Sequence, residues 1–167
     1  LGLETVPAED KAALLAFQQK TARLQRAILG ANMLLGEASS RLAHIRKAIQ
    51  YTNARGADWV SRTDKMSNDL KDIQKLLQGD RTIARRSEPI PMSISRRMGE
   101  IIQAQWSSSS APTKTSMTAY DIAADEFAAV LPQLKKLITV DLKRLEDDLE
   151  IAGAPFTPGR FPDWEKE

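Results

Sequence analysis

Apolar and small side chains recur at alternating three- and four-residue steps between residues 7 and 52. The positions are Leu14, Phe17, Thr21, Leu24, Ile28, Ala31, Leu35, Ala38, Leu42, Ile45, Ile49 and Thr52. This spacing is the a/d pattern of a helix that packs one face against other helices. The sequence therefore predicts one very long first helix, and a single rod cannot bury such a face without further helices beside it.

The middle of this predicted helix, residues 27–38, is mostly apolar or small outside the stripe as well. A helix that is apolar on most sides is usually covered on most sides, so we expect this part at the centre of the bundle. Gly30 and Gly36 disfavour a helix interior, and we interpret them as points where another helix approaches closely.

A second helix is expected at residues 58–78, after a turn at residues 53–57. Its apolar stripe again follows four- and three-residue steps and comprises Trp59, Thr63, Met66, Leu70, Ile73 and Leu77. Gly79 is a suitable C-terminal stop. Because the connecting turn is short, the first two helices should form an antiparallel hairpin.

A short amphipathic helix is expected at residues 93–106. It follows an irregular stretch, residues 80–92, in which Pro89 and Pro91 exclude regular helix. Ser93 is a suitable N-cap. The apolar residues on or near one face are Ile94, Met98, Ile101, Ile102 and Trp106.

The last predicted helix runs from about residue 115 to residue 152, and Gly153 ends it. Its apolar set comprises Met117, Tyr120, Ala124, Phe127, Leu131, Leu134, Ile138, Leu145 and Leu149. Pro132 removes one helical hydrogen bond and predicts a kink. The expected fold class is therefore all-α: an elongated up-down bundle of about four helices in a single domain, residues 1–167, with a very long first helix and a kinked last helix.

The tail, residues 154–167, is expected to be irregular because prolines stand between its aromatic residues. We expect Phe156, Phe161 and Trp164 either to fold back on one end of the bundle or to pack on a neighbouring domain. They are the candidate domain-interface residues.

The composition excludes several classes of function. Of 167 residues, 24 are Lys or Arg and 22 are Asp or Glu, and a net charge of +2 gives no general attraction to nucleic acid or to an anionic membrane. The absence of Cys excludes disulfides and thiolate chemistry. No apolar run approaches the ~20 residues of a transmembrane helix. No metal site or other cofactor is predicted, since the single His, His44, is expected at the surface or its boundary.

Five arginines fall between residues 80 and 97, namely Arg81, Arg85, Arg86, Arg96 and Arg97. The guanidinium group can bind carboxylate or phosphate through two parallel hydrogen bonds, so these residues are candidates for docking an anion or a partner. The alternative is that they pair with neighbouring acidic residues and fix the irregular segment. RNA or DNA binding would need interleaved aromatic residues and a net basic domain, and the sequence has neither.

No catalytic residues are predicted. The acidic runs near residues 121–126 and 147–150 lie largely off the apolar stripe and are expected on a solvated face. Serine catalysis needs a positioned base, and Ser107, Ser108, Ser109 and Ser110 have none nearby in the sequence.

From residue 79 onward the order of segments is distinctive: GDRTIARRSEPIPMSISRRMGEII, then QWSSSSAPTKTSMTAYDIAADEFAAVLPQLKKLI, then LEIAGAPFTPGRFPDW. The first helix, PAEDKAALLAFQQKTARLQRAI, adds to the pattern. Together they resemble the helical C-terminal region of bacterial exported β-propeller proteins of the sortilin-like (VPS10-like), BNR-repeat class, often labelled glycosyl-hydrolase-like. Residues 36–77 match only in helical pattern.

The resemblance implies an accessory module that follows a β-propeller on the same chain, in an exported protein. Any hydrolase-like or peptide-binding activity would belong to the propeller, so the expectation here is a non-catalytic structural or interaction domain, with self-association or protein binding as its role. Two other hypotheses stay open. One is a stand-alone helical adaptor or ligand-sensing bundle, and the other is an enzyme whose site the sequence does not reveal.

Overall fold

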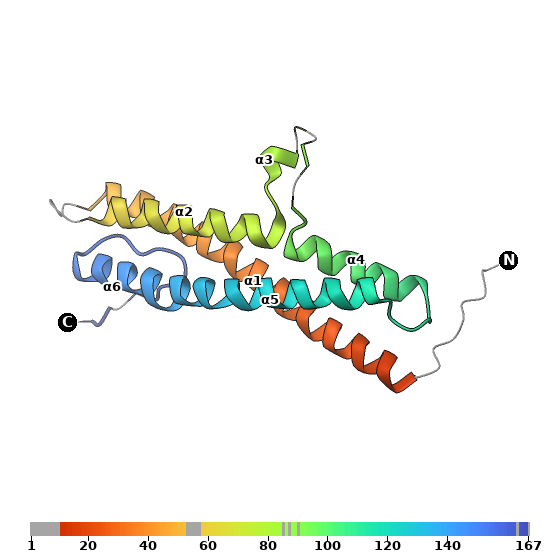
Figure 1. The fold of residues 1–167 in the computed structure, drawn as a ribbon. Helices are drawn as coiled ribbons and strands as arrows, with labels where there is room; N and C mark the ends of the chain where they lie inside the picture. Colours follow the sequence, from red (N-terminus) through yellow and green to blue (C-terminus); the bar gives the residue numbers. More distant parts are fainter. Residues whose placement is uncertain are drawn as a thin grey trace. The chain divides into compact units, whose positions relative to one another are not determined.

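The computed structural model describes residues 11–52, 58–84, 86, 88–89, 91–162 and 164–166, with the side chains of Arg81 and Ala84 excepted. Its helices are α1 (Lys11–Gln50), α2 (Trp59–Gln78), the single turn α3 (Arg81–Ala84), α4 (Ile94–Ser107), α5 (Lys114–Lys136), the π-helix η1 (Leu137–Leu142) and α6 (Lys143–Ile151) (Figure 1). This part of the chain contains no strand. The all-α fold is confirmed, with its long first helix and a kinked last helix formed by α5, η1 and α6.

The chain divides into two compact units. Unit 1 comprises Leu1–Asn32 and Gln74–Leu131, and unit 2 comprises Met33–Ile73 and Pro132–Glu167. Helices α1, α2 and α5 each contribute residues to both units. The expectation of one domain over residues 1–167 stays a prediction.

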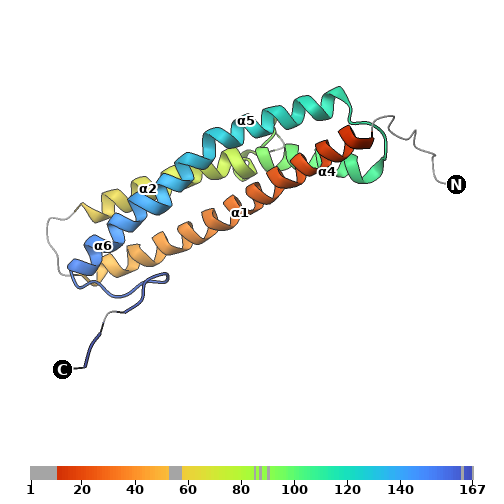
Figure 2. The same cartoon turned by 90° about the horizontal axis from the view of Figure 1, so that it is seen from below.

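Helix α1 is uninterrupted (Figures 1 and 2). The predicted stripe is confirmed as its buried face. Its fully buried members are Phe17, Thr21, Ile28, Ala31, Leu35, Ala38, Leu42 and Ile45. Thr21 is tolerated there because its hydroxyl donates to the carbonyl of Phe17 at 2.6 Å, which satisfies the buried polar group. The face that the spacing selects is therefore the face that the fold buries.

The expectation that the middle of α1 is covered on most sides is wrong. Leu29, Met33 and Leu34 are 56%, 77% and 47% exposed. A Cβ placed on Gly30 or Gly36 would meet no neighbouring atom within 4 Å. These glycines therefore mark no close helix approach among the described residues. Apolar composition alone does not show whether a neighbour is present, and these three apolar side chains are largely uncovered.

All six predicted stripe positions of α2 are buried, from Trp59 to Leu77. Gly79 ends the helix with φ +89° and its N–H donates to the carbonyl of Lys75 at 2.8 Å, as predicted for a C-terminal glycine. The predicted turn, residues 53–57, lies outside the described residues. In unit 2, Arg46 near the end of α1 forms an ion pair with Asp64 near the start of α2, as an antiparallel hairpin requires.

The stretch predicted to be irregular contains the helical turn α3. The carboxylate of Asp80 accepts hydrogen bonds from the hydroxyl of Thr82 and from its backbone N–H, the latter at 2.9 Å. These bonds hold the pKa of Asp80 below its usual value, and the bond from the Thr82 hydroxyl has the largest effect. Asp is a preferred residue at the N-cap of a helix, so Asp80 could have indicated this helical turn in the sequence.

Helix α4 begins as predicted, since the hydroxyl of Ser93 accepts from the N–H of Arg96 at 3.4 Å. Ile94, Met98 and Ile101 form its buried face. Trp106 does not belong to that face, because it is 84% exposed.

The last helix buries a stripe that differs from the predicted one. The buried positions are Ala123, Phe127, Val130, Leu134, Leu137, Leu142, Leu145 and Leu149. Met117 and Leu131, which were predicted to be apolar contacts, are 39% and 41% exposed. The steps are four or three residues long until Leu137, where a five-residue step to Leu142 spans η1. In a regular α-helix five residues turn the chain about 140° past a full turn, so the wider π-turn is what keeps Leu142 on the buried face.

We predict that deletion of Thr139, an exposed residue of η1, is tolerated. The shortened segment can form a regular α-helix in which Leu137 and Leu142 are four residues apart, so the loss in free energy of unfolding should stay below about 1 kcal/mol. Deletion of the exposed Asn68 in the regular helix α2 turns its two halves by about 100° relative to each other. That deletion should cost at least about 3 kcal/mol in urea unfolding. Equal losses for the two deletions would contradict the role assigned to the π-turn.

Candidate functional site

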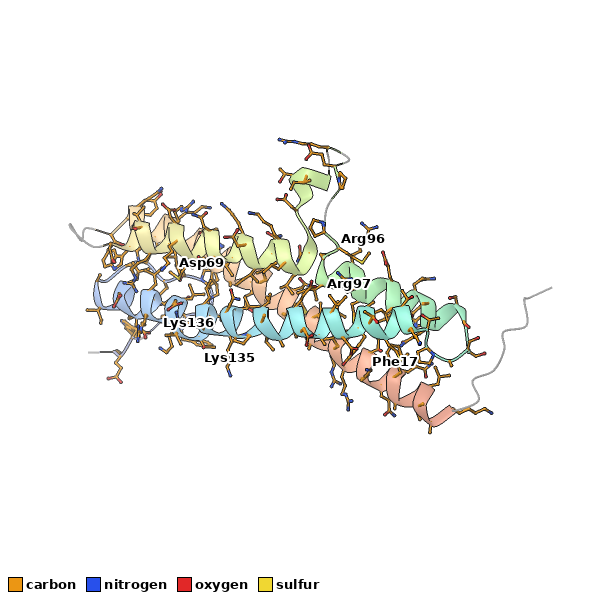
Figure 3. All side chains as sticks on the ribbon, viewed as in Figure 1. Phe17, Asp69, Arg96, Arg97, Lys135 and Lys136 are labelled. Atoms are coloured by element: carbon orange, nitrogen blue, oxygen red, sulfur yellow. The ribbon has the colours of Figure 1, made fainter. Side chains whose placement is uncertain are left out.

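The predicted arginine site is partly described by the structure. Arg96 is exposed, with Nε 3.4 Å from Oε1 of Glu100, and Arg97 lies with Nε 4.0 Å from Oε2 of Glu126 on α5. The two side chains leave α4 in different directions (Figure 3). Arg86 is exposed, whereas Arg85 and the side chain of Arg81 lie outside the described residues. A docking role for these five arginines stays a prediction.

The tail is attached to unit 2, but its aromatic residues point outward. Phe156, Phe161 and Trp164 are 47%, 95% and 78% exposed, so they do not fold back on the described helices as one of the two expectations had it. Ala154 and Thr157, in contrast, are buried. The aromatic residues are therefore displayed on a segment that is itself held in place.

Two contacts within unit 2 hold the tail. Arg160 forms an ion pair with Glu150 of α6, and its guanidinium carbon lies 5.1 Å from the ring centre of Phe156. Gly159 has φ +94°, and a Cβ there would lie 3.2 Å from Nε of Arg41. Only glycine adopts this turn without strain while the backbone lies so close to a guanidinium group.

A buried ion pair underlies this contact. Arg41 of α1 donates from Nη2 to both carboxylate oxygens of Glu146, at 2.6 and 2.7 Å, and from Nε to Oε1 at 3.0 Å. The side chains are 17% and 7% exposed. Glu146 directly precedes the acidic run, residues 147–150, that was expected on a solvated face. No local pattern indicates this pair, because its partners are 105 residues apart.

Unit 2 contains a polar hollow of about 340 Å³ with charged walls, which we call the basic hollow. Residues from α2 and from the last helix line it: Arg62, Lys65, Met66, Asp69, Lys136, Asp141 and Arg144. Four of these seven side chains are cationic and two are anionic. The sequence did not reveal it, since its cations come from separate helices and none belongs to the arginine-rich segment.

Unit 1 contains an apolar groove of about 230 Å³. The groove is lined by Leu14 and Phe17 of α1, by residues of α4, and by the serine-rich loop before α5. Tyr120 packs edge-on against Phe17 with ring centres 6.0 Å apart, and Nζ of Lys20 lies 4.1 Å from the Tyr120 ring centre. Nothing around the groove indicates what covers it.

Among the residues that the structure describes, no three His, Cys, Asp or Glu side chains gather as metal ligands would. No described helix combines the length and the apolar character needed to cross a bilayer. No family model matches the sequence, and neither the curated proteins nor the solved structures include one that is significantly similar.

We predict that Glu146→Ala lowers the free energy of unfolding by about 3 kcal/mol or more, because it leaves the guanidinium of Arg41 buried without its carboxylate. Asp64→Ala removes the exposed pair with Arg46 and should cost at most about 1 kcal/mol. The double variant Arg41→Met/Glu146→Met should recover most of the loss. Chemical unfolding of the unchanged protein and the three variants measures these differences. Equal losses of unfolding free energy in Glu146→Ala and Asp64→Ala would show that burial does not strengthen the pair of Arg41 with Glu146.

Proposed function

We propose that this chain is a non-catalytic accessory domain that docks on another protein surface through its aromatic tail. The proposed partner is a β-propeller that precedes it on the same exported polypeptide. One observation carries the proposal: Phe161 and Trp164 are 95% and 78% exposed on a tail whose earlier residues Ala154 and Thr157 are buried.

Exposed aromatic residues on an anchored segment are suited to protein binding. Trp and other large side chains supply much of the binding energy at protein interfaces. A segment that is ordered before binding loses less conformational entropy when the complex forms. The ion pair of Arg160 with Glu150 and the turn at Gly159 supply that prior order.

The non-catalytic part of the proposal is supported by the hydrogen bonding of Glu146, the most buried carboxylate of the described residues. Glu146 is held by three hydrogen bonds from Arg41. Its oxygens are thus committed to a cation rather than aimed into a cavity. The choice of a propeller as partner comes from the resemblance of residues 79–164 to the C-terminal region of propeller-containing exported proteins.

We predict that Phe161→Ser/Trp164→Ser weakens binding to the separately expressed propeller at least tenfold, because both changed side chains are interface anchors. Trp106→Ser is the matched control, since Trp106 is also exposed, at 84%, but lies on α4 rather than on the tail. Its affinity should stay within twofold of the unchanged protein. Calorimetric titration of the propeller with each variant gives the three affinities.

Two results would contradict the proposal. The first is the absence of binding between the propeller and the unchanged chain. The second is an affinity that the tail substitutions leave unchanged. If the chain dimerises with increasing concentration and Phe161→Ser/Trp164→Ser abolishes the dimer, the tail binds a second copy of the chain instead.

A further inference from the structure

We propose that the basic hollow of unit 2 binds a small multivalent oxyanion, such as a phosphate ester or a polycarboxylate. This site is separate from the docking role of the tail. Phe161 and Trp164 are absent from its lining, and so are Arg86, Arg96 and Arg97.

Two cations of the hollow form no ion pair with a described residue. Arg62 is committed, because its Nη1 lies 2.5 Å from Asp148 and 3.7 Å from Asp58. Lys136 lies 3.9 Å from Asp141. Lys65 and Arg144, in contrast, form no ion pair with any described residue, and both are exposed. Asp69 is likewise in no ion pair with a described residue, so the side chains outside these pairs carry one net positive charge.

The π-turn is what places one wall of the hollow. Lys136 and Asp141 are five residues apart, and in a regular α-helix that spacing would put them about 140° apart around the axis. Across η1 they instead form an ion pair, and Arg144 follows on the same wall. π-turns are uncommon and often occur at functional sites. Here the π-turn shapes the charged wall of the hollow and also keeps Leu142 on the buried stripe.

The opposite wall is one face of α2. Arg62, Lys65 and Asp69 are spaced three and four residues apart and therefore lie on neighbouring turns of one side. Figure 3 shows Asp69 on α2 and Lys136 on α5. Lys135, the residue that precedes Lys136 in the chain, projects from the other side of α5, away from α2.

The chemistry of the two uncommitted cations defines the ligand class. The guanidinium of Arg144 can bind two oxygens of one phosphate or carboxylate, and the ammonium of Lys65 supplies a compact second charge from the facing helix. A ligand that carries two or more negative charges can engage both. Asp69 opposes such a ligand, because like charges repel, so the affinity should be modest and should decrease with added salt.

The test is calorimetric titration of the chain with inorganic pyrophosphate and, separately, with citrate at constant low ionic strength. We expect saturable binding at one site by at least one anion, and the tighter of the two identifies phosphate or carboxylate as the preferred chemistry. Lys65→Ala/Arg144→Ala should weaken that binding at least tenfold. Asp69→Asn removes the opposing charge and should strengthen it about threefold.

Lys135→Ala is the control, because it removes a positive charge of α5 beside Lys136 but outside the hollow. Its affinity should stay within twofold of the unchanged protein. The substituted side chains are exposed, so circular dichroism should show unchanged helix content in every variant. The proposal is overturned if neither anion binds saturably, if Lys135→Ala weakens binding as much as the double variant does, or if Asp69→Asn weakens it.

Discussion

The structure depends on one constraint: each long helix buries a narrow stripe of apolar side chains against its neighbours. On α1 this stripe runs from Phe17 to Ile45 in three- and four-residue steps, and on α2 from Trp59 to Leu77. Regular α-helices maintain such a stripe without adjustment. The last helix cannot, because Leu137 and Leu142 are five residues apart, and the π-turn η1 absorbs the extra residue. The same adjustment sets the wall that carries Lys136, Asp141 and Arg144.

The sequence predicted the parts of the fold that repeat. The stripes of α1 and α2, the cap at Ser93 and the stop at Gly79 each follow from a local pattern, and each is present. Where the pattern depended on composition alone it misled, as at Met33 and Trp106, because an apolar side chain does not show whether a neighbour covers it. The π-turn was missed because it appears only as a five-residue step between buried leucines.

The candidate sites were less predictable than the fold. Arg41 and Glu146 are buried together but 105 residues apart, and neither stands out in its own segment. The basic hollow likewise combines cations from two distant helices. The arginine-rich segment did stand out, yet Arg96 and Arg97 leave α4 in different directions. Charges that are close in the sequence are thus a weaker guide to a site than charges that helix packing brings together in space.

The buried ion pair of unit 2 also positions the tail, which is the segment that carries the proposed function. Its course is fixed where Gly159 lies against Arg41, so the buried ion pair that holds α1 to α6 also positions the segment that carries the aromatic residues. The tail is thus held on unit 2 as far as Arg160 without any partner. This order distinguishes the tail from an unstructured linker, whose residues would lose their freedom only on binding.

The most direct measurement is the fluorescence of Trp164 as the only tryptophan, in a variant in which Trp59 and Trp106 are replaced by Phe. In the free chain Trp164 is 78% exposed and should emit as a solvated indole. If the tail docks on the propeller, adding that domain should shift the emission to shorter wavelength as the ring leaves water. An unchanged emission maximum at propeller concentrations that saturate binding would show that the tail is not the docking surface.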